Sequence, residues 1–527
     1  MLVPCSIFNR AVALISFLYV LSTLSTCNAA IQNAAIRQTD EAQARAATIK
    51  DAFLVAYNDY IRYGYPADEV LPVSKGGRNS RNGCLIAKRV RIFLSPMKDA
   101  FDDAVNKTLK IDFSTNHTDD LVVVFETTIR YVGGILSAYE LSGANNQALL
   151  DQARVLTDKL IYAWPDENQK LPYSVLSFTD NTPASDIVSL AAAGSMIVEF
   201  DRLSYYTKND KYRNLADKSM KFLMDLPGIF PGLPGLRYSA KNGSVIQDRV
   251  TWGASADSYY EYLLKYPMLT NQADPVYLES WKKAVGSSIK YLVTTSSLQN
   301  LTYLDEYSES EGGKRHMFSH LACFAVLAHI TQYLWRICDS PGGNWMMGGR
   351  VLNDPEILRY GILLLETCMR SYTATKTGLG PEIFNFLPPD GSDGQRGNSE
   401  FYKANGFYIT NSQYMLRPEV IESAFYAWRI TGETKYQDFV WNAFQALQNT
   451  CKAPASYSAI DNVNSPNPKL KDDCESFLTY ISPLHLPTCC PWINMSSYVS
   501  MQNIPQAEKL VEQKTKIQHR YARQQDA

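Results

Sequence analysis

The chain has 527 residues, with 51 basic and 53 acidic side chains, a formal net charge of −2 and an apolar fraction of 46%. That length allows one large core or several smaller ones. Because the charges balance, the chain has no excess of positive charge of the kind that binds nucleic acid or an anionic membrane. With 20% charged and 12% aromatic residues, the composition also excludes a polytopic membrane protein and a disordered chain. The 33 tyrosines suit a surface for neutral sugars or, equally, a large helical core.

The N-terminal residues 1–29 predict a signal peptide. Arg10 supplies a positive charge, residues 11–24 form an apolar run, and small residues near Ala29 offer a cleavage site. Because the run is short for a membrane-spanning helix, a retained anchor in the ER or Golgi is the less favoured alternative. We therefore expect the chain to enter the secretory pathway and to be secreted, with no membrane association after cleavage.

The cysteines and the glycosylation sequons fit that compartment. Eight cysteines remain after residues 1–29, which is too few for a disulfide scaffold, and no CxxC pair marks zinc. One or two structural disulfides are the expected use. Sequons of the form N-x-S/T predict a glycoprotein, and they begin at Asn106, Asn116, Asn242, Asn300 and Asn494.

Apolar residues recur with a helical period along almost the whole chain. One face joins residues 187–198, and another follows the start signal Asp354-Pro355 through Cys368. Strand-like alternation is confined to short pieces between helices.

Three similar units place a small polar turn between two amphipathic helices. The turns are at 142–143, 207–212 and 431–436. Repeated helical hairpins favour either an open solenoid or a closed toroid, and the irregular spacing with long loops rich in Gly and Pro favours the closed form. No low-complexity linker divides residues 45–480, so we expect one domain over 30–478, followed by a tail over 479–527.

Two glutamates lie at predicted helix beginnings. Glu126 follows an apolar stretch, which suits a desolvated proton donor, although a first-turn glutamate facing the helix dipole is the plainer alternative. Glu419 follows Pro418 in a predicted first turn, where an ionised general base is favoured and Arg417 could contact a sugar. Ordinary helix-start chemistry explains such a Pro-Glu pair as well.

Asp257 and Glu382 complete a set of four acids. Asp257 begins a predicted helix with Glu261 one turn later, and the three nearby tyrosines suit either a sugar platform or the core. Glu382 closes a Gly-rich stretch in which Pro381 predicts a helix start. If the hairpins alternate, the four acids lie at one end of the toroid, and opposed carboxylates are what glycosidic hydrolysis requires.

Other chemistries find less support in the sequence. Its six histidines include no HExxH pattern, which argues against a zinc hydrolase. No GxSxG elbow, Walker loop or GxGxxG motif occurs. A glycosidase therefore remains the favoured class.

Seven short stretches follow one another in the order of a known family. They are 80–83 (SRNG), 124–130 (VFETTIR), 257–263 (DSYYEYL), 320–324 (HLACF), 378–382 (GLGPE), 416–423 (LRPEVIES) and 475–477 (ESF). Together they resemble the class I alpha-1,2-mannosidases, glycoside hydrolase family 47, in their fungal form.

The resemblance implies an all-α (α/α)7 barrel and an inverting exo-alpha-1,2-mannosidase that trims terminal mannose from high-mannose N-glycans. It implies that Glu126 is the general acid and Glu419 the base, that Asp257 shares or contests the base role, and that Glu382 is a further active-site acid. Arg417, Glu422 and Glu475 match substrate-binding or metal-shell positions. Cys323 and Cys368 match the structural disulfide of the family. A monomer is expected, with no nucleic acid partner.

The sequence departs from the family pattern at 84–105, at 325–347 and at the C-terminus. The last departure removes the threonine that, in the family, holds the calcium cofactor, so we expect a weakened metal site with no metal ligand assigned in this chain, and low activity. The family pattern stops abruptly at each departure, which is typical of misjoined coding segments. Sequencing of the transcript would test this hypothesis.

Two alternatives stay open. A non-catalytic mannose-binding lectin of glycoprotein quality control would keep the pocket without turnover. Another α/α-toroid enzyme, such as a polysaccharide lyase, fits the architecture. This sequence, however, lacks the basic cleft that an anionic polymer requires.

Overall fold

The computed structural model describes residues 39–67, 69–79, 98–115, 121–325, 344–388, 390 and 397–475. All of them belong to one compact unit, Met1–His485, and a second unit comprises Leu486–Ala527. The predicted signal peptide 1–29 and tail 479–527 lie outside the described residues, as do 84–97 and 326–343 of the two internal departures and the sequons at Asn116 and Asn494.

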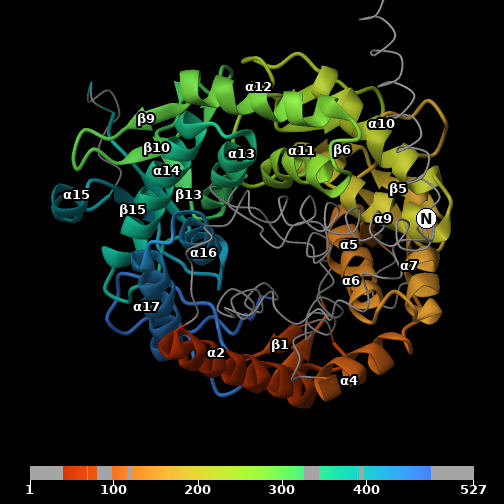
Figure 1. The fold of residues 1–527 in the computed structure, drawn as a ribbon, viewed down its shortest axis with the longest axis horizontal. Coiled ribbons are helices and arrows are strands. Elements are labelled where there is room, and N and C mark those ends of the chain that lie inside the picture. Colours follow the sequence, from red (N-terminus) through yellow and green to blue (C-terminus); the bar gives the residue numbers. More distant parts are fainter. Residues whose placement is uncertain are drawn as a thin grey trace, which may run out of the picture. The chain divides into compact units, whose positions relative to one another are not determined.

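Within the first unit the helices follow one another around a ring in two layers (Figure 1). The inner layer contains α6 (Gly133–Leu141), α9 (Ile197–Thr207), α11 (Asp257–Leu269), α13 (Asn344–Leu352) and α16 (Glu419–Thr431). The short helices α5 (Val124–Thr127) and α8 (Leu190–Gly194) precede α6 and α9, and the π-helix η2 (Thr128–Val132) joins α5 to α6. Burial agrees with this placement, because every residue over 419–430 of α16 is buried.

The outer layer contains helices that bury only one face. They are α2 (Asp40–Asp59), α4 (Lys98–Thr108), α7 (Gln147–Leu160), α10 (Lys211–Asp225), α12 (Pro275–Tyr291), α14 (Pro355–Thr373) and α17 (Thr434–Thr450). In α10 the buried side chains are Tyr212, Ala216, Ser219, Met220 and Leu223, which recur at helical spacing. The inner layer therefore supplies the centre of the core, and the outer layer covers it.

The three predicted hairpins are confirmed as the pairs α6–α7, α9–α10 and α16–α17. Left-handed residues close their turns, with φ of 87° at Gly143, 56° at Lys208 and 81° at Gly432. The start of α14 is confirmed as well, because the side chain of Asp354 accepts hydrogen bonds from the N–H groups of Glu356 and Ile357.

The single helical face predicted over residues 187–198 is wrong. Ile187 lies in strand β6 (Ile187–Ser189) and pairs with Ser239 of β7 (Arg237–Ser239). The helical residues that follow are divided between α8 and α9. Ile187 is 46% exposed, so pairing with a distant strand overrides the local helical period.

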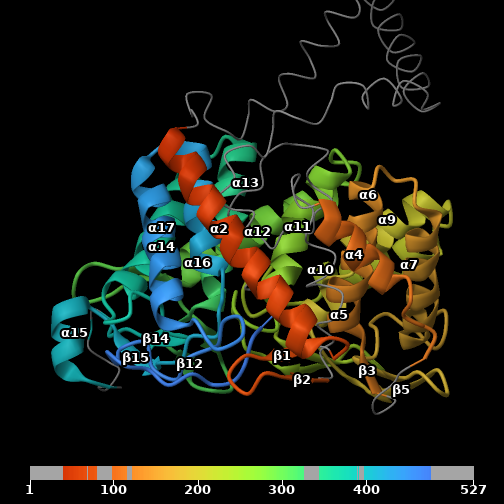
Figure 2. The ribbon, with the colours of Figure 1, turned by 90° about the horizontal axis from the view of Figure 1, so that it is seen from below.

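Short antiparallel strands lie at one end of the helices (Figure 2). Those not yet given are β1 (Glu69–Leu71), β2 (Gly76–Arg78), β3 (Leu121–Val123), β4 (Val175–Ser177), β5 (Thr182–Ser185), β8 (Val245–Gln247), β9 (Val293–Thr295), β10 (Thr302–Leu304), β11 (Tyr307–Ser308), β12 (Gly313–Lys314), β13 (Met317–Ser319), β14 (Ile383–Asn385) and β15 (Tyr408–Asn411). The remaining elements are the π-helix η1 (Tyr60–Gly64), the 3₁₀ helices η3 (Ile161–Ala163) and η4 (Leu321–Ala325), and α15 (Ser399–Asn405).

The predicted all-α fold class, an (α/α) barrel of paired helices, is confirmed. In the part of the chain that the structure covers, no helix combines the length and apolar character needed to cross a membrane.

Candidate active site

Arg417 joins two of the predicted acids. Its Nε donates to both carboxylate oxygens of Glu382, at 2.9 and 2.8 Å, and its Nη1 lies 3.7 Å from Oε1 of Glu419. Leu416, directly before it, has a left-handed φ of 61°, so the chain turns sharply just before α16 begins. Burial opposes the charge of Arg417, but the carboxylates of Glu419 and Glu382 outweigh it and raise the pKa of the guanidinium.

Asp257, the first residue of α11, lies close enough to the same group to feel its charges. Burial raises the pKa of Asp257 to about 7, from an ordinary value of 3.8. The charges of Glu419 and Glu126 act in the same direction as burial, whereas the N–H of Ser258 and the charge of Arg417 lower the pKa. The structure therefore brings together acids that are distant in the sequence, at the strand end of the inner helices.

Glu126 lies in the first turn of α5, directly after β3. Its side chain is 21% exposed, and Nε of Arg130, one turn later, donates to its Oε2 at 2.6 Å. The following π-helix η2 and the close approach of Gly133 to Glu199 of α9 fix the path of this segment. Glu126 is thus the most accessible of the acids around Asp257.

His320, for which no role was predicted, is a neighbour of Glu419. Its Nδ1 lies 3.2 Å from Oε2 of Glu419, and its Nε2 lies 2.7 Å from the hydroxyl of Tyr372. Its backbone N–H donates to the carbonyl oxygen of Glu382 at 2.8 Å. The motif HLACF contained this residue, but only the fold shows that its ring bridges α16 and α14.

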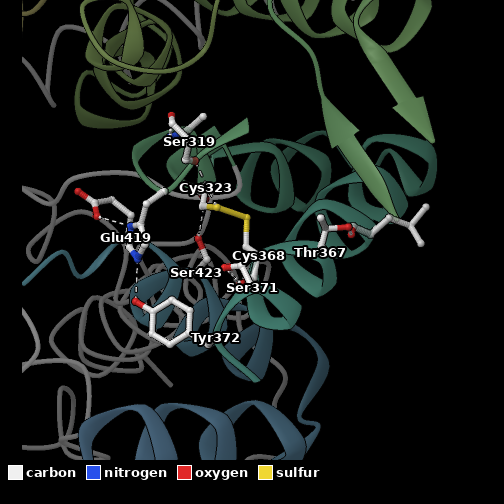
Figure 3. The surroundings of a disulfide bond; sticks show 11 residues. Ser319, Cys323, Thr367, Cys368, Ser371, Tyr372, Glu419 and Ser423 are labelled. Carbon is white, nitrogen blue, oxygen red and sulfur yellow. Dashed lines mark hydrogen bonds and ion pairs between the residues drawn. A yellow bond between two sulfur atoms is a disulfide. The ribbon is translucent and has the colours of Figure 1, made fainter. Parts of the chain in front are cut away.

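The predicted disulfide between Cys323 and Cys368 is confirmed, with their Cα atoms 6.2 Å apart. Figure 3 shows it between η4 and α14, with Ser423 of α16 beside it and Glu419 nearby. The hydroxyl of Ser423 donates to the carbonyl oxygen of Cys323 at 3.1 Å. The disulfide therefore anchors the segment that carries His320 to the outer helix and, through Ser423, to α16.

The other predicted binding residues occupy two different settings. Glu422 is buried in α16, where burial raises its pKa well above the ordinary value, and it accepts a hydrogen bond from Tyr426 at 3.2 Å. Glu475 is half-buried, and its charge contributes to the raised pKa of Arg417. Both residues therefore adjoin the group formed around Arg417 and Glu419.

A buried ion pair lies one turn below Asp257 in α11. Nζ of Lys265 is 2.6 Å from Oε1 of Glu261, and both side chains are 1% exposed. Burial raises the pKa of Glu261 to about 7, against the pull of Lys265. The charge of Lys265 also opposes the effect of burial on the pKa of Glu422. One ammonium group therefore favours the ionised form of two buried acids.

The structure decides one alternative that the sequence left open and overturns one expectation about the surroundings of the acids. The three tyrosines after Asp257 form no sugar platform, because Tyr259, Tyr260 and Tyr262 are at most 2% exposed and pack in the core. Glu382 does not begin a helix but lies directly before β14, where its N–H donates to the carbonyl oxygen of Gln413. Proline at position 381 precedes a strand here, since strand pairing decides the local conformation.

The described side chains do not fit a direct calcium site. Calcium takes about six to eight oxygen ligands. In residues 39–475, gaps excepted, no group of three His, Cys, Asp or Glu side chains could hold a metal ion. Glu261 is engaged by Lys265, and Glu422 has one buried oxygen, Oε2, without a hydrogen-bond partner.

Known proteins resemble this chain over most of its length. The glycosyl hydrolase family 47 profile matches residues 52–479. The probable mannosyl-oligosaccharide alpha-1,2-mannosidase 1B of Aspergillus clavatus is 36% identical over 471 residues, which cover 84% of this chain and 86% of that protein. The mannosyl-oligosaccharide alpha-1,2-mannosidase of Coccidioides posadasii is 36% identical over 457 residues, with 83% of each chain covered.

A solved structure agrees with both comparisons. The alpha-1,2-mannosidase from Trichoderma reesei superimposes with a TM-score of 0.76 at 31% identity, covering 84% of this chain and 93% of the other. The ring of paired helices, the acids at its strand end and these likenesses lead to one classification. This chain belongs to glycosyl hydrolase family 47.

Proposed function

We propose that this protein is an inverting exo-alpha-1,2-mannosidase that removes terminal mannose from high-mannose N-glycans. The alpha-1,2-mannosidases among its relatives support the linkage and the sugar. The observation that carries the proposal is that Asp257 lies within electrostatic reach of Glu126, Glu419 and Arg417. Opposed carboxylates of this kind serve the two proton transfers of glycosidic hydrolysis.

Glu126 is the proposed general acid. Its side chain is 21% exposed, whereas that of Glu419 is 2% exposed, so the oxygen of a departing sugar can reach Glu126. Arg130 donates to Oε2 and thereby orients the carboxyl group. The remaining oxygen, Oε1, is the atom from which we propose that the proton passes to the leaving oxygen.

Glu419 is the proposed base that activates water, and Asp257 is its competitor for that role. Arg417 lies 3.7 Å from Oε1 of Glu419 and His320 lies 3.2 Å from its Oε2, so each oxygen has its own neighbour. Asp257 has a pKa of about 7, which matches a group that gains and loses a proton near neutral pH. Parallel Glu419→Gln and Asp257→Asn variants separate the two roles, since the true base causes the larger loss of kcat.

Substrate contacts are proposed for Arg417, Glu422 and Glu475, with Glu382 as a further active-site acid. Glu382 orients the guanidinium by accepting hydrogen bonds from Nε, and we propose that the guanidinium oriented in this way also contacts sugar hydroxyls. We propose that Glu422 and Glu475 bind hydroxyl groups of the same sugar, either directly or through water.

We propose that calcium is a weakly bound cofactor, because the described His, Cys, Asp and Glu side chains form no direct site for it. When bound, such an ion would supply positive charge beside the sugar hydroxyls. We expect less than one calcium ion per chain at micromolar concentration, measured by titration calorimetry. Stoichiometric binding, together with loss of activity in chelator, would contradict this expectation.

The secretory pathway is the proposed location, and high-mannose N-glycans on glycoproteins are the proposed partners of a monomeric enzyme. The disulfide between Cys323 and Cys368 supports an oxidising compartment. Domain bounds at 1–29, 30–478 and 479–527 stay predictions.

Mannose release from a high-mannose N-glycan tests the function. We expect Glu126→Gln and Glu419→Gln to lower kcat by roughly 10²- to 10⁴-fold, and NMR of the first product to show the β-anomer that inversion produces. Glu400→Gln in α15, which is exposed, is the matched control and should retain full activity.

Three outcomes would count against the proposal. Unchanged kcat in both site variants would remove the carboxylates from the chemistry. An α-anomeric product would contradict inversion. A wild-type chain that binds the glycan without cleaving it, with the same affinity in Glu126→Gln, would instead identify a lectin.

A further inference from the structure

The hairpin between β7 and β8 presents one complete sequon to solvent. Asn242 and Ser244 are exposed, and Gly243 between them has a φ of +75°. The N–H of Ser244 donates to Oδ1 of Asn242 at 3.0 Å, and backbone hydrogen bonds join Ser239 to Gly243 and Ser244. Within the described residues no hydrogen bond engages Nδ2 of Asn242, so the turn is held without that nitrogen atom.

Two apolar side chains follow this sequon directly. Val245 is 47% exposed and Ile246 is 50% exposed, and both lie in β8 at the edge of its sheet. An edge strand with exposed β-branched side chains is a site of unwanted pairing unless something covers it. At about 3.3 Å per residue, Val245 lies within about 10 Å of Asn242 along the chain.

We propose that Asn242 carries an N-linked oligosaccharide that covers Val245 and Ile246. The proposal rests on the proposed passage through the secretory pathway. In the transfer, Nδ2 of Asn242 bonds to the anomeric carbon of a lipid-linked oligosaccharide diphosphate. The bond from that carbon to the diphosphate oxygen breaks, the diphosphate leaves with the electron pair, and an amide proton passes to a base of the transferase. A bulky hydrophilic chain then stands beside the apolar edge.

The two other sequons that the structure describes differ from this one. At Asn106 in α4, the hydroxyl of Thr108 is fully buried and donates to the carbonyl oxygen of Ala104. At Asn300, Thr302 is 7% exposed because it lies in β10 and pairs with Thr295. Folding therefore buries part of the sequons at Asn106 and Asn300. The sequon at Asn242 stays accessible after the β7–β8 hairpin has formed.

Peptide mapping of the full chain, secreted from a eukaryotic host, tests the site. After enzymatic deglycosylation in heavy-oxygen water, we expect the label mainly at Asn242, with lower occupancy at Asn106 and Asn300. Asn242→Gln and Ser244→Ala should each remove one oligosaccharide by gel mobility. Ser244→Thr, which preserves the hydroxyl group, should keep it.

The covering role has its own measurement. Asn242→Gln should aggregate faster and bind more of the dye ANS than wild type, and adding Val245→Thr with Ile246→Thr should restore wild-type behaviour. An unmodified Asn242 in a secreted chain with full mannosidase activity would overturn this inference and leave the proposed function standing. A chain without any oligosaccharide would overturn the inference together with the secretory location.

Discussion

Ionisable side chains are deeply buried between the inner helices α11 and α16, whereas those that join the N-terminal and C-terminal segments lie near the surface. At this seam Nη2 of Arg78 contacts Asp473 at 3.0 Å, and the N–H groups of Val73 and Ser74 donate to Oδ1 of Asp472 at 2.7 and 3.1 Å. Arg78 is 46% exposed, whereas Lys265 and Glu261 are each 1% exposed.

The difference in burial decides what each charge does. At the seam, water can replace a lost partner, so the contacts hold the ends of the ring together without perturbing one another strongly. Between α11 and α16 the side chains of Lys265 and Glu261 are shielded from bulk solvent, so each charge shifts the pKa of its neighbours and its removal leaves an unbalanced group. Variants that break matched pairs in the two regions test this contrast.

Removing the buried ammonium should have the largest effect. Lys265→Met leaves Glu261 without its partner, and we expect a loss of about 3–5 kcal/mol in the free energy of unfolding. Adding Glu261→Leu should recover most of that loss, because the pair then becomes apolar. Denaturant midpoints measure both.

The control for this variant is a similarly spaced pair on an outer helix. Lys107 pairs with Asp103 in α4, but the lysine side chain is 21% exposed. We expect Lys107→Met to change the free energy of unfolding by less than about 0.5 kcal/mol. Equal losses in the two lysine variants would refute the proposed role of burial.

Glu199→Gln should reduce the pH dependence of stability. Burial raises the pKa of Glu199 in the folded protein to about 8, from 4.5, although the hydroxyl of Tyr262 donates to it at 2.8 Å. Its stabilising contribution is complete below pH 4.5 and is lost as the pH rises through 8, by up to about 5 kcal/mol.

Denaturant midpoints between pH 5 and pH 8 measure this slope. Glutamine stays neutral at every pH, so the variant should lose less stability than wild type over that interval. The exposed variant Glu400→Gln should keep the wild-type slope. If Glu199→Gln also kept it, the titration of Glu199 would not be coupled to unfolding.

Asp472→Ala should have a smaller effect than the buried variants, with a loss of about 1 kcal/mol at pH 7. Burial raises the pKa of Asp472, but hydrogen bonds from Ser74 and Val73 outweigh burial and place the pKa below its usual value. The stability that this carboxylate adds is therefore present above the ordinary pKa and is lost as the pH falls through the lower folded value.

The difference between wild type and Asp472→Ala should accordingly shrink in acid. Arg45→Met, which removes the 2.9 Å contact with Asp438 between α2 and α17, is the matched seam variant. It should cost about 0.5 kcal/mol. A loss above that of Lys265→Met in either seam variant would reverse the order of the two regions.

Much of the fold could be read from local patterns, and the failures share one cause. The hairpin turns and the Asp354 cap were predictable because their hydrogen bonds join residues close in sequence. Ile187 and Glu382 were misplaced because strands far along the chain pair with their segments. The three tyrosines after Asp257 were ambiguous, since composition does not tell whether a helix lies in the inner or the outer layer.

The sequence by itself determined the paired helices, the fold class, the family and the disulfide between Cys323 and Cys368, because short-range periodicity and ordered motifs carry that information. Only the tertiary structure decided that His320 contacts Glu419, that Lys265 serves two buried acids, and that Asp257 has a pKa near 7. Those properties depend on desolvation and on charges from other helices. Neither exists until the ring has brought distant residues together.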